Sequence, residues 1–428
     1  MQGAKGGAHP GCTRRGARRG EGGTPLLVPR RAQRPKCDRV LPPEVGSGPP
    51  KAANEARLRG LHEVYPRPKL FGVSPTGATG LDWKTGPQEW PVSAGLLETA
   101  RGGGLTLRRE NEACYSSSVS SNEPVYLTLL PGGGLEQRAL AARRRTAACD
   151  LCARACRIDR SMRLGACRIG MSARVASYGP HHGEEDPLRG WAGSGTIFFS
   201  GCNLRCQYCQ NHDISQGHAG ADVTAEGLAG MMLALQDRGC HNINLVSPSH
   251  VVAPILEALT FAARAGLRVP IVYNTGGFDS LEALALLDGV VDIYMPDMKY
   301  GDSRIARRLS RVLAYPDANR RAVREMHRQV GDLVVDRRGL AVRGLLVRHL
   351  VLPGDLAGTS QIVRFLAEEI SPNTYLNLMD QYRPAYRAGQ NPPLNRPVSR
   401  EEYRAARKMA TQAGLTRLDG RGPARIPN

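Results

Sequence analysis

The chain has 428 residues, with 58 Lys and Arg against 39 Asp and Glu and a formal net charge of +19. This length is enough for one large α/β domain, or two smaller ones, with a substantial core. The sequence has no run of about 18 apolar residues, and residues 1–7 lack the apolar segment of a secretory signal. These features argue against a membrane or secreted protein, so we expect a cytoplasmic one.

The positive charge is spread over the N-terminal third and over arginine-rich patches such as residues 143–145. A polyanionic partner such as RNA and a simply solvated surface both account for this distribution. The chain also has eleven cysteines. Without a secretory signal, these cysteines indicate reduced thiols that bind metal rather than a disulfide framework.

Residues 1–124 are rich in Gly, Pro, Arg and Ser and show no apolar periodicity, which predicts a disordered, low-complexity extension. Its cysteines, Cys12, Cys37 and Cys114, are widely and irregularly spaced, and we assign them no role. Residues 420–428 are predicted to be a tail.

A small cysteine-rich module is predicted over residues 125–190, beginning with a helix at 135–147. Its four cysteines have the spacing C-x2-C-x3-C-x10-C and are Cys149, Cys152, Cys156 and Cys167. Four thiolates complete a closed tetrahedral zinc site or a second iron–sulfur cluster. The alternative is a set of metal-free thiols that pack a small subdomain. The polar cluster that follows, His181, His182, Glu184 and Glu185, either closes over a nearby site or forms an exposed turn.

From residue 191 to 419, strand-like and helix-like segments alternate, which predicts parallel strands with right-handed crossovers. The predicted strands are 196–199, 243–246, 269–273, 291–295, 344–351 and 374–379. The predicted helices are 225–239, capped by Thr224, then 251–266, 279–287, 316–330 and a last one that opens with a capping box at 399–402 and stops at Gly414. Six such units form an α/β fold of the partial (β/α)6 TIM-barrel type.

Three cysteines, Cys202, Cys206 and Cys209, follow the first strand in the spacing C-x3-C-x2-C. Three thiolates can bind three corners of an iron–sulfur cube and leave one iron open, whereas a structural zinc site needs four ligands. The alternatives are zinc completed by His212 and thiols without metal.

This cysteine motif, with Tyr208 before its last cysteine, resembles the radical S-adenosylmethionine (radical SAM) superfamily. Within it, the chain resembles the PflX-like branch, relatives of the pyruvate formate-lyase activating enzymes, over about residues 125–415. The segments that carry the resemblance are 195–211, 241–250, 271–277, 292–300, 348–354 and 379–382.

The resemblance implies that Cys202, Cys206 and Cys209 hold a 4Fe-4S cluster whose open iron binds S-adenosylmethionine. Reductive cleavage of this cofactor would give a 5′-deoxyadenosyl radical that abstracts hydrogen from a substrate. The resemblance also implies an electron donor such as flavodoxin or ferredoxin. The expected substrate is a glycine of a partner protein, since the related enzymes activate glycyl-radical enzymes.

The residues after each strand should face one cavity, because sites in parallel α/β barrels lie at the C-terminal strand ends. Candidate catalytic residues are Asp297, Lys299 and His349. Candidate cofactor-binding residues are Tyr208, Asn211, Ser247, Asn274, Gly276, Gly277 and Arg348. Taken singly, these residues are equally well explained as turns, caps, a buried ion pair or a structural histidine. Many relatives have Gly-Gly-Glu after the second strand where this chain has residues 246–250, VSPSH, which leaves the cofactor contact there open.

Two other functions fit the same sequence. One is radical SAM modification of RNA or of a peptide, which the basic composition favours weakly. The other is a non-catalytic iron–sulfur or zinc protein that binds nucleic acid or carries electrons. Salt-dependent polynucleotide binding would favour the latter, and 5′-deoxyadenosine formation the enzyme.

Overall fold

The computed structural model describes residues 123–419. The extension predicted for residues 1–124 lies outside this part except for its last two residues. Cys12, Cys37, Cys114 and the tail at 420–428 lie outside it as well.

Six parallel strands form the centre of a nine-stranded sheet, and each pairs with the next one along the chain. They are β2 (Ser194–Phe199), β4 (Ile243–Val246), β5 (Ile271–Thr275), β6 (Ile293–Pro296), β8 (Ala341–Leu350) and β9 (Tyr375–Met379). All six predicted strands are confirmed, with ends that shift by three residues at most. Their order is that expected of the partial barrel.

Helices follow the parallel strands, and the predicted caps are present on two of them. The Thr224 side chain accepts a hydrogen bond from Gly227 N, and Ser399 and Glu402 form a complete capping box. The helices are α4 (Ala225–Asp237), α5 (Val252–Arg264), α6 (Leu281–Leu287), α7 (Ser303–Ser310), α8 (Tyr315–Val330), α9 (Thr359–Phe365) and α10 (Arg400–Gln412). Ser280 caps α6 in the same way as Thr224 caps α4. Neither α7 nor α9 was predicted.

The sheet also includes three antiparallel strands that the sequence did not predict. β1 (Ala173–His181) pairs antiparallel with β2, and β3 (Ala221–Val223) pairs antiparallel with β1. β7 (Val334–Val335) pairs antiparallel with β8. The remaining short elements are η1 (Val125–Leu129), η2 (Thr146–Ala148), α2 (Asp186–Arg189), α3 (His212–Ser215), η3 (Pro248–His250), η4 (Pro353–Asp355), η5 (Leu366–Ile370) and η6 (Ala388–Gln390).

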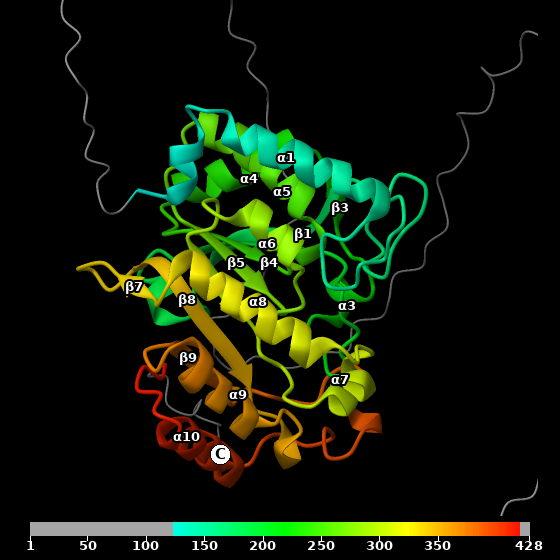
Figure 1. Ribbon diagram of the computed structural model, residues 1–428, viewed down its shortest axis with the longest axis vertical. Coiled ribbons are helices and arrows are strands. Elements are labelled where there is room, and N and C mark those ends of the chain that lie inside the picture. Colours follow the sequence, from blue (N-terminus) through cyan, green and yellow to red (C-terminus); the bar gives the residue numbers. More distant parts are fainter. Residues whose placement is uncertain (1–122, 420–428) are drawn as a thin grey trace, which may run out of the picture. The chain divides into compact units, whose positions relative to one another are not determined.

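The helix that precedes the cysteine-rich segment, α1 (Gly134–Arg145), packs on the helices of the sheet. It contacts α5 and α6, and Figure 1 shows it across the same side as α4 and α5. Leu135, Ala139 and Ala142 of α1 belong to the same hydrophobic core as β4 and α5. Burial of these side chains therefore ties the start of the described chain to the sheet.

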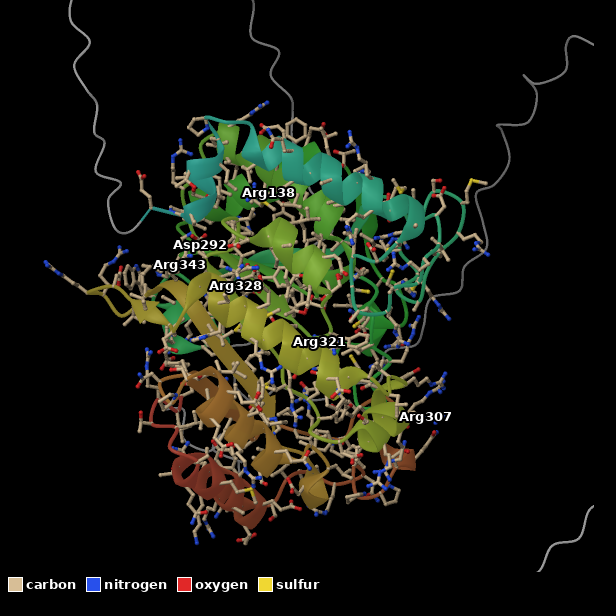
Figure 2. The ribbon with its side chains drawn as sticks, in the orientation of Figure 1. Arg138, Asp292, Arg307, Arg321, Arg328 and Arg343 are labelled. Carbon is tan, nitrogen blue, oxygen red and sulfur yellow. The ribbon has the colours of Figure 1, made fainter. Side chains whose placement is uncertain are left out.

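Two polar features lie at the edge of this core: the buried Asp292 and the exposed side of α8. Asp292, labelled in Figure 2, accepts hydrogen bonds from Val125 N at 2.7 Å and Ile271 N at 2.9 Å, and so anchors η1 to the sheet. On α8 the predicted apolar residues Val323 and Met326 are buried, while Arg328 lies on its exposed side. Between residues 123 and 419, none of the helices has both the length and the apolar character needed to cross a membrane.

Candidate functional site

The three cysteines predicted as cluster ligands lie in one loop between β2 and α3. The loop turns at Gly201, whose φ of 78° lies in the left-handed region. A Cβ at this position would approach the backbone oxygen of Cys167 to 2.6 Å, so only glycine fits. Farther along, Arg205 N donates to Ser310 O at 3.2 Å, and Gln207 N donates to Leu309 O at 2.8 Å. The loop is thus fixed against the end of α7.

Each of the three sulfurs has a hydrogen-bonding partner. Leu204 N donates to Cys202 Sγ at 3.3 Å, Ser310 Oγ donates to Cys206 Sγ at 3.0 Å, and the Cys209 Sγ lies 3.2 Å from Ser215 Oγ. Hydrogen bonds to sulfur are a regular feature of iron–sulfur ligation and tune the cluster potential. The donor set therefore fits a cluster that takes three ligands from one loop.

Burial disfavours free thiolates in this loop. It raises the pKa of Cys202 to about 12 and raises the pKa of Cys206 as well. A bound cation would remove this penalty, because metal ions bind the deprotonated thiol. Across residues 123–419, no three His, Cys, Asp or Glu side chains are grouped closely enough for a single metal ion. A cube-shaped cluster makes a different demand, since each cysteine binds a separate iron.

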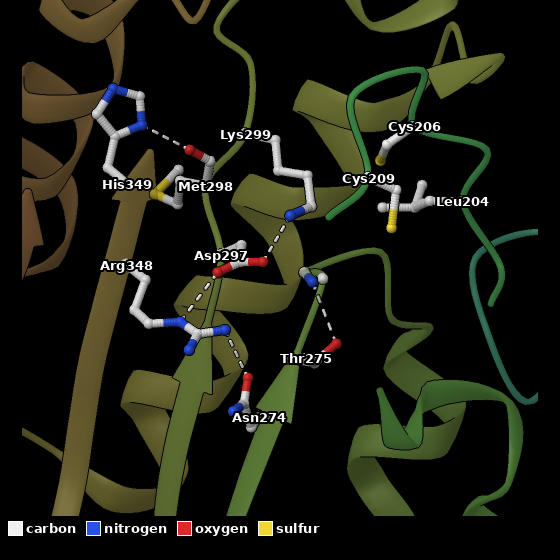
Figure 3. A network of polar contacts seen from close by, with 12 residues as sticks. Leu204, Cys206, Cys209, Asn274, Thr275, Asp297, Met298, Lys299, Arg348 and His349 are labelled. Carbon is white, nitrogen blue, oxygen red and sulfur yellow. Dashed lines mark hydrogen bonds and ion pairs between the residues drawn. The ribbon is translucent and has the colours of Figure 1, made fainter. Parts of the chain in front are cut away.

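A chain of charged and polar side chains lies at the ends of β5, β6 and β8, beside the cysteine loop (Figure 3). Lys299 Nζ is 2.6 Å from Asp297 Oδ2, and Arg348 Nε is 3.1 Å from Asp297 Oδ1. Arg348 also donates to Asn274 Oδ1 at 2.6 Å. Four predicted site residues thus form one continuous network.

The charges in this network control its protonation. Burial alone would raise the pKa of Asp297, but Lys299 and Arg348 outweigh it and hold the pKa below its ordinary value. For Lys299, burial works toward a lower pKa, while Asp297 and then Cys206 raise it above the usual value. Lys299 is therefore a fixed positive charge that points to Asp297 and lies beside the cysteine loop, as Figure 3 shows.

The two predicted glycines have different surroundings. A Cβ on Gly276 would lie 3.1 Å from Leu204 Cδ1 and 3.7 Å from Lys299 Cε, so this glycine borders the space between the loop and the network. Gly277 has a φ of 73°, and a Cβ there would overlap Asn319 and the backbone oxygen of Asp297. Gly277 thus permits the turn, while Gly276 leaves room at the site.

The other predicted residues fall into two groups. Tyr208, within the cysteine loop, is buried and packs edge-on against Tyr300 and Tyr382. Ser247 adopts the left-handed conformation after β4 and donates its N–H to Asn274 O at 2.9 Å, which places it next to the network. Asn211 is exposed at the start of α3 and has no contact with the network among the described residues.

His349 lies beside the site rather than in it. Its Nδ1 is 2.7 Å from Met298 O, and its Nε2 is 3.0 Å from Thr359 Oγ1. Burial lowers its pKa, which keeps the ring neutral. With both ring nitrogens occupied, the geometry matches the structural histidine that the sequence left as an alternative.

Two acidic residues that no site prediction included also reach the network. Glu184 Oε2 is 3.9 Å from Arg348 Nη1, and Glu185 accepts a hydrogen bond from Asn377 Nδ2 at 2.8 Å. Both glutamates are buried, and burial raises the pKa of Glu185. His181 and His182 from the same cluster are exposed. The polar residues at 181–185 were the available sequence signal, but the sequence did not show which of these side chains point toward the site.

A basic hollow adjoins the cysteine loop. Its lining includes Arg205 and Gln207, which flank Cys206, and three further arginines: Arg168, Arg311 and Arg387. Within residues 123–419, no carboxylate forms an ion pair with any of these four arginines. The hollow is therefore a locally uncompensated positive surface.

Comparisons with known proteins identify the family of this chain. The sequence model of the radical SAM superfamily matches residues 196–338. An uncharacterized protein of Methanocaldococcus jannaschii is 32% identical over 277 residues, which cover 62% of this chain and 75% of that protein. The chain therefore belongs to the radical SAM superfamily and is a radical SAM enzyme.

Solved structures give a more distant likeness. A radical SAM methyltransferase from Sphaerobacter thermophilus aligns with 51% of this chain and 64% of its own, at 15% identity and a TM-score of 0.34. SuiB of Streptococcus suis, bound to its precursor peptide SuiA, aligns with 51% of this chain and 45% of its own, at 12% identity and a TM-score of 0.34. The chain thus spans less than two thirds of either solved structure.

Proposed function

We propose that Cys202, Cys206 and Cys209 hold a 4Fe-4S cluster and that S-adenosylmethionine binds between this loop and the Asp297 network. The observation that carries the proposal is that three hydrogen-bonded sulfurs lie in one loop beside the charged network of Lys299, Asp297 and Arg348. The six parallel strands in chain order support a partial (β/α)6 barrel around this space.

The network's role would be to bind and orient the cofactor. Lys299 and Arg348 supply positive charge for its carboxylate, and Asp297 supplies negative charge for its amino or sulfonium group. Gly276 leaves space for its close approach, and Tyr208 lines the loop side with an aromatic ring. When bound, the cluster and S-adenosylmethionine together supply a 5′-deoxyadenosyl radical that removes a hydrogen atom from the substrate.

For the substrate, we propose a peptide segment, with the glycine of a glycyl-radical enzyme as the first target to test. Three buried polar residues near the network would bind amide and ammonium groups of this segment: Glu184, Glu185 and Asn377. Hydrogen abstraction from RNA is the competing choice, and the assay below, repeated with each substrate, separates them.

The reducing electron would enter through the basic hollow, which we propose as the docking surface for an acidic carrier of the flavodoxin or ferredoxin type. Arg205 and Gln207 of the cysteine loop line this hollow directly, so a bound carrier would lie next to the cluster ligands. Its four unpaired arginines complement an acidic protein surface.

The experiment is anaerobic reconstitution with iron and sulfide, reduction with dithionite, and measurement of 5′-deoxyadenosine formed from S-adenosylmethionine. Wild type is compared with a Cys202/Cys206/Cys209 triple alanine variant and with Cys240→Ala, whose cysteine is buried in the core away from the loop. We expect product from wild type and Cys240→Ala and none from the triple variant. Undiminished cleavage by the triple variant would contradict the assignment. A wild-type protein with a fully loaded cluster that cleaves no S-adenosylmethionine, even with the candidate substrates present, would indicate an electron carrier instead.

A further inference from the structure

A second group of cysteines lies behind the cysteine loop. Cys149, Cys152, Cys156 and Cys167 line one pocket, together with Arg160 and His250 among others. We call it the four-cysteine pocket. The four thiols are free of disulfides. Cys152 and Cys167 are buried, while Cys149 and Cys156 are partly buried. Cysteines up to eighteen positions apart in the sequence thus line the same pocket.

The backbone around this pocket is held in conformations that ordinary residues avoid. Cys149 N donates to Ile158 O at 2.8 Å and Arg157 N donates to Cys149 O at 2.9 Å, which closes the segment on itself. Ala155 and Arg157, on either side of Cys156, have φ of 41° and 53°, and Arg168, after Cys167, has φ of 60°. Each such non-glycine residue costs about 1–2 kcal/mol. A ligand bound by the adjacent cysteines would offset this cost.

A fixed positive charge lies beside the sulfurs of the pocket. Burial raises the pKa of Cys152 and of Cys167, as it does for Cys202 in the cysteine loop, so a bound cation is needed to hold these sulfurs as thiolates. Arg160 is buried and donates to His250 O at 2.7 Å and Ile169 O at 3.1 Å, so a positive charge is fixed beside the sulfurs. A cluster with four thiolates is anionic and would be balanced by that charge.

We propose that the four-cysteine pocket holds a second iron–sulfur cluster, closed on all four corners by protein ligands. Four free sulfurs line one pocket beside the buried Arg160, which matches the four corners of a cube in which each cysteine binds a separate iron. Tetrahedral zinc is the competing ligand, and the metal content decides between them. With no open iron, this cluster cannot bind S-adenosylmethionine.

The pocket also supports the cysteine loop. Arg154 Nε donates to Asn203 O at 2.7 Å, Arg205 donates to Ala166 O, and Gly201 packs against Cys167 O. A cluster that orders residues 149–167 would therefore also order the loop that carries Cys202. The closed cluster thus acts on the radical site as a positioning element, and loss of it should lower iron loading in the loop.

The test is the metal content of the full chain, which does not require catalysis. The Cys202/Cys206/Cys209 triple alanine variant, reconstituted anaerobically, should retain about four irons per chain and show a 4Fe-4S spectrum that S-adenosylmethionine leaves unchanged. Folding of the variant is checked by circular dichroism. One zinc per chain after purification, or a folded variant without iron, would overturn the proposal.

Wild-type protein provides the second measurement in case the triple variant does not fold. We expect about eight irons per chain and two reduced cluster signals, of which S-adenosylmethionine shifts one. About four irons and a single signal, fully shifted by the cofactor, would refute the second cluster. This outcome leaves the radical site intact, so it is distinguishable from a failure of the proposed function.

Discussion

The hydroxyl of Ser310, the last residue of α7, donates a hydrogen bond to the sulfur of Cys206 across 3.0 Å. The same hydroxyl lies 2.6 Å from the Tyr300 hydroxyl, and Ser310 is fully buried. A helix end is thus linked directly to the middle cysteine of the loop. Since no strand or motif near residue 310 signals this contact, it is a feature that only the folded chain reveals.

Ser310→Ala should make the loop cluster harder to reduce. A hydrogen bond to a ligand sulfur stabilises the more negative, reduced state, so its loss should lower the reduction potential by tens of millivolts, on the order of 1 kcal/mol. The measurement is a redox titration followed by electron paramagnetic resonance. Ser249→Ala is the matched control, because its buried hydroxyl bonds Thr275 and no sulfur. An unchanged potential in Ser310→Ala would contradict the proposed ligation.

If the basic hollow is the docking surface, removal of its arginines should weaken binding of the protein electron donor alone. The Arg311→Gln/Arg387→Gln variant should bind an acidic flavodoxin at least about tenfold more weakly, because two uncompensated charges are lost. Cleavage driven by dithionite should stay near wild type, since this small reductant needs no docking surface. The measurement is the flavodoxin dependence of 5′-deoxyadenosine formation at low salt.

The control for this variant removes two arginines elsewhere. Arg400→Gln/Arg404→Gln on α10 changes the net charge equally but leaves the hollow untouched. If both double variants weakened flavodoxin to the same degree, the effect would be one of overall charge and the hollow would not be the docking surface.

Alanine substitutions at the adjacent glycines should separate an effect on cofactor binding from an effect on folding. Gly276→Ala meets only the flexible end of Leu204 at 3.1 Å, so the fold should persist while the affinity for S-adenosylmethionine falls by about tenfold, or 1.4 kcal/mol. Gly277→Ala is strained at a φ of 73° and overlaps backbone, which should cost more than about 2 kcal/mol of folding free energy. Cofactor binding by calorimetry and urea unfolding of each variant check this. Equal effects on both quantities in both variants would contradict the separation.

The capping box of α10 predicts a pH dependence of stability. Hydrogen bonds from Arg396, and then from Ser399 N and Gly354 N, outweigh partial burial and lower the pKa of Glu402 from 4.5 to about 2. Because the folded-state pKa lies below the unfolded one, the carboxylate stabilises the fold fully above pH 4.5, and this contribution is lost as the pH falls toward 2.

Glu402→Gln should therefore cost about 1–2 kcal/mol of folding free energy at pH 7, a value reduced for the partial exposure of this ion pair. The difference from wild type should shrink as the pH drops from 5 to 3. Urea unfolding of the apoprotein at several pH values measures it. A difference that stayed constant down to pH 3 would show that Glu402 acts through packing and not through its charge.

The six parallel strands were predictable because each is a short apolar run between turn-forming residues, as 243–246 illustrates. Strand-end rules then placed Asn274, Asp297, Lys299 and Arg348 at one edge, where the structure joins them in one network. The same rules placed His349 there too, although its ring serves Met298 and Thr359. Neighbours on a strand alternate in direction, so Arg348 and His349 cannot both face the site.

Long-range contacts account for what the sequence did not show. β1 contains Gly179 and Pro180 and lacks a strand-like apolar alternation, so only its pairing with β2 defines it as a strand. Glu184 and Glu185 reach Arg348 and Asn377 over more than 160 positions, which no local pattern encodes. The cysteine spacing, in contrast, is local, and it led directly to the loop.

The antiparallel strands β1 and β3 have a consequence for self-association. A parallel sheet that does not close leaves rows of unpaired N–H and C=O groups on its outer strands, which invite pairing with another copy of the chain. Here β1 covers the outer side of β2, and the next edge is the three-residue β3. At the other end, Leu376 of β9 bridges to Leu418. Both margins of the described sheet thus carry an additional pairing, which should limit strand-to-strand association between copies of the chain.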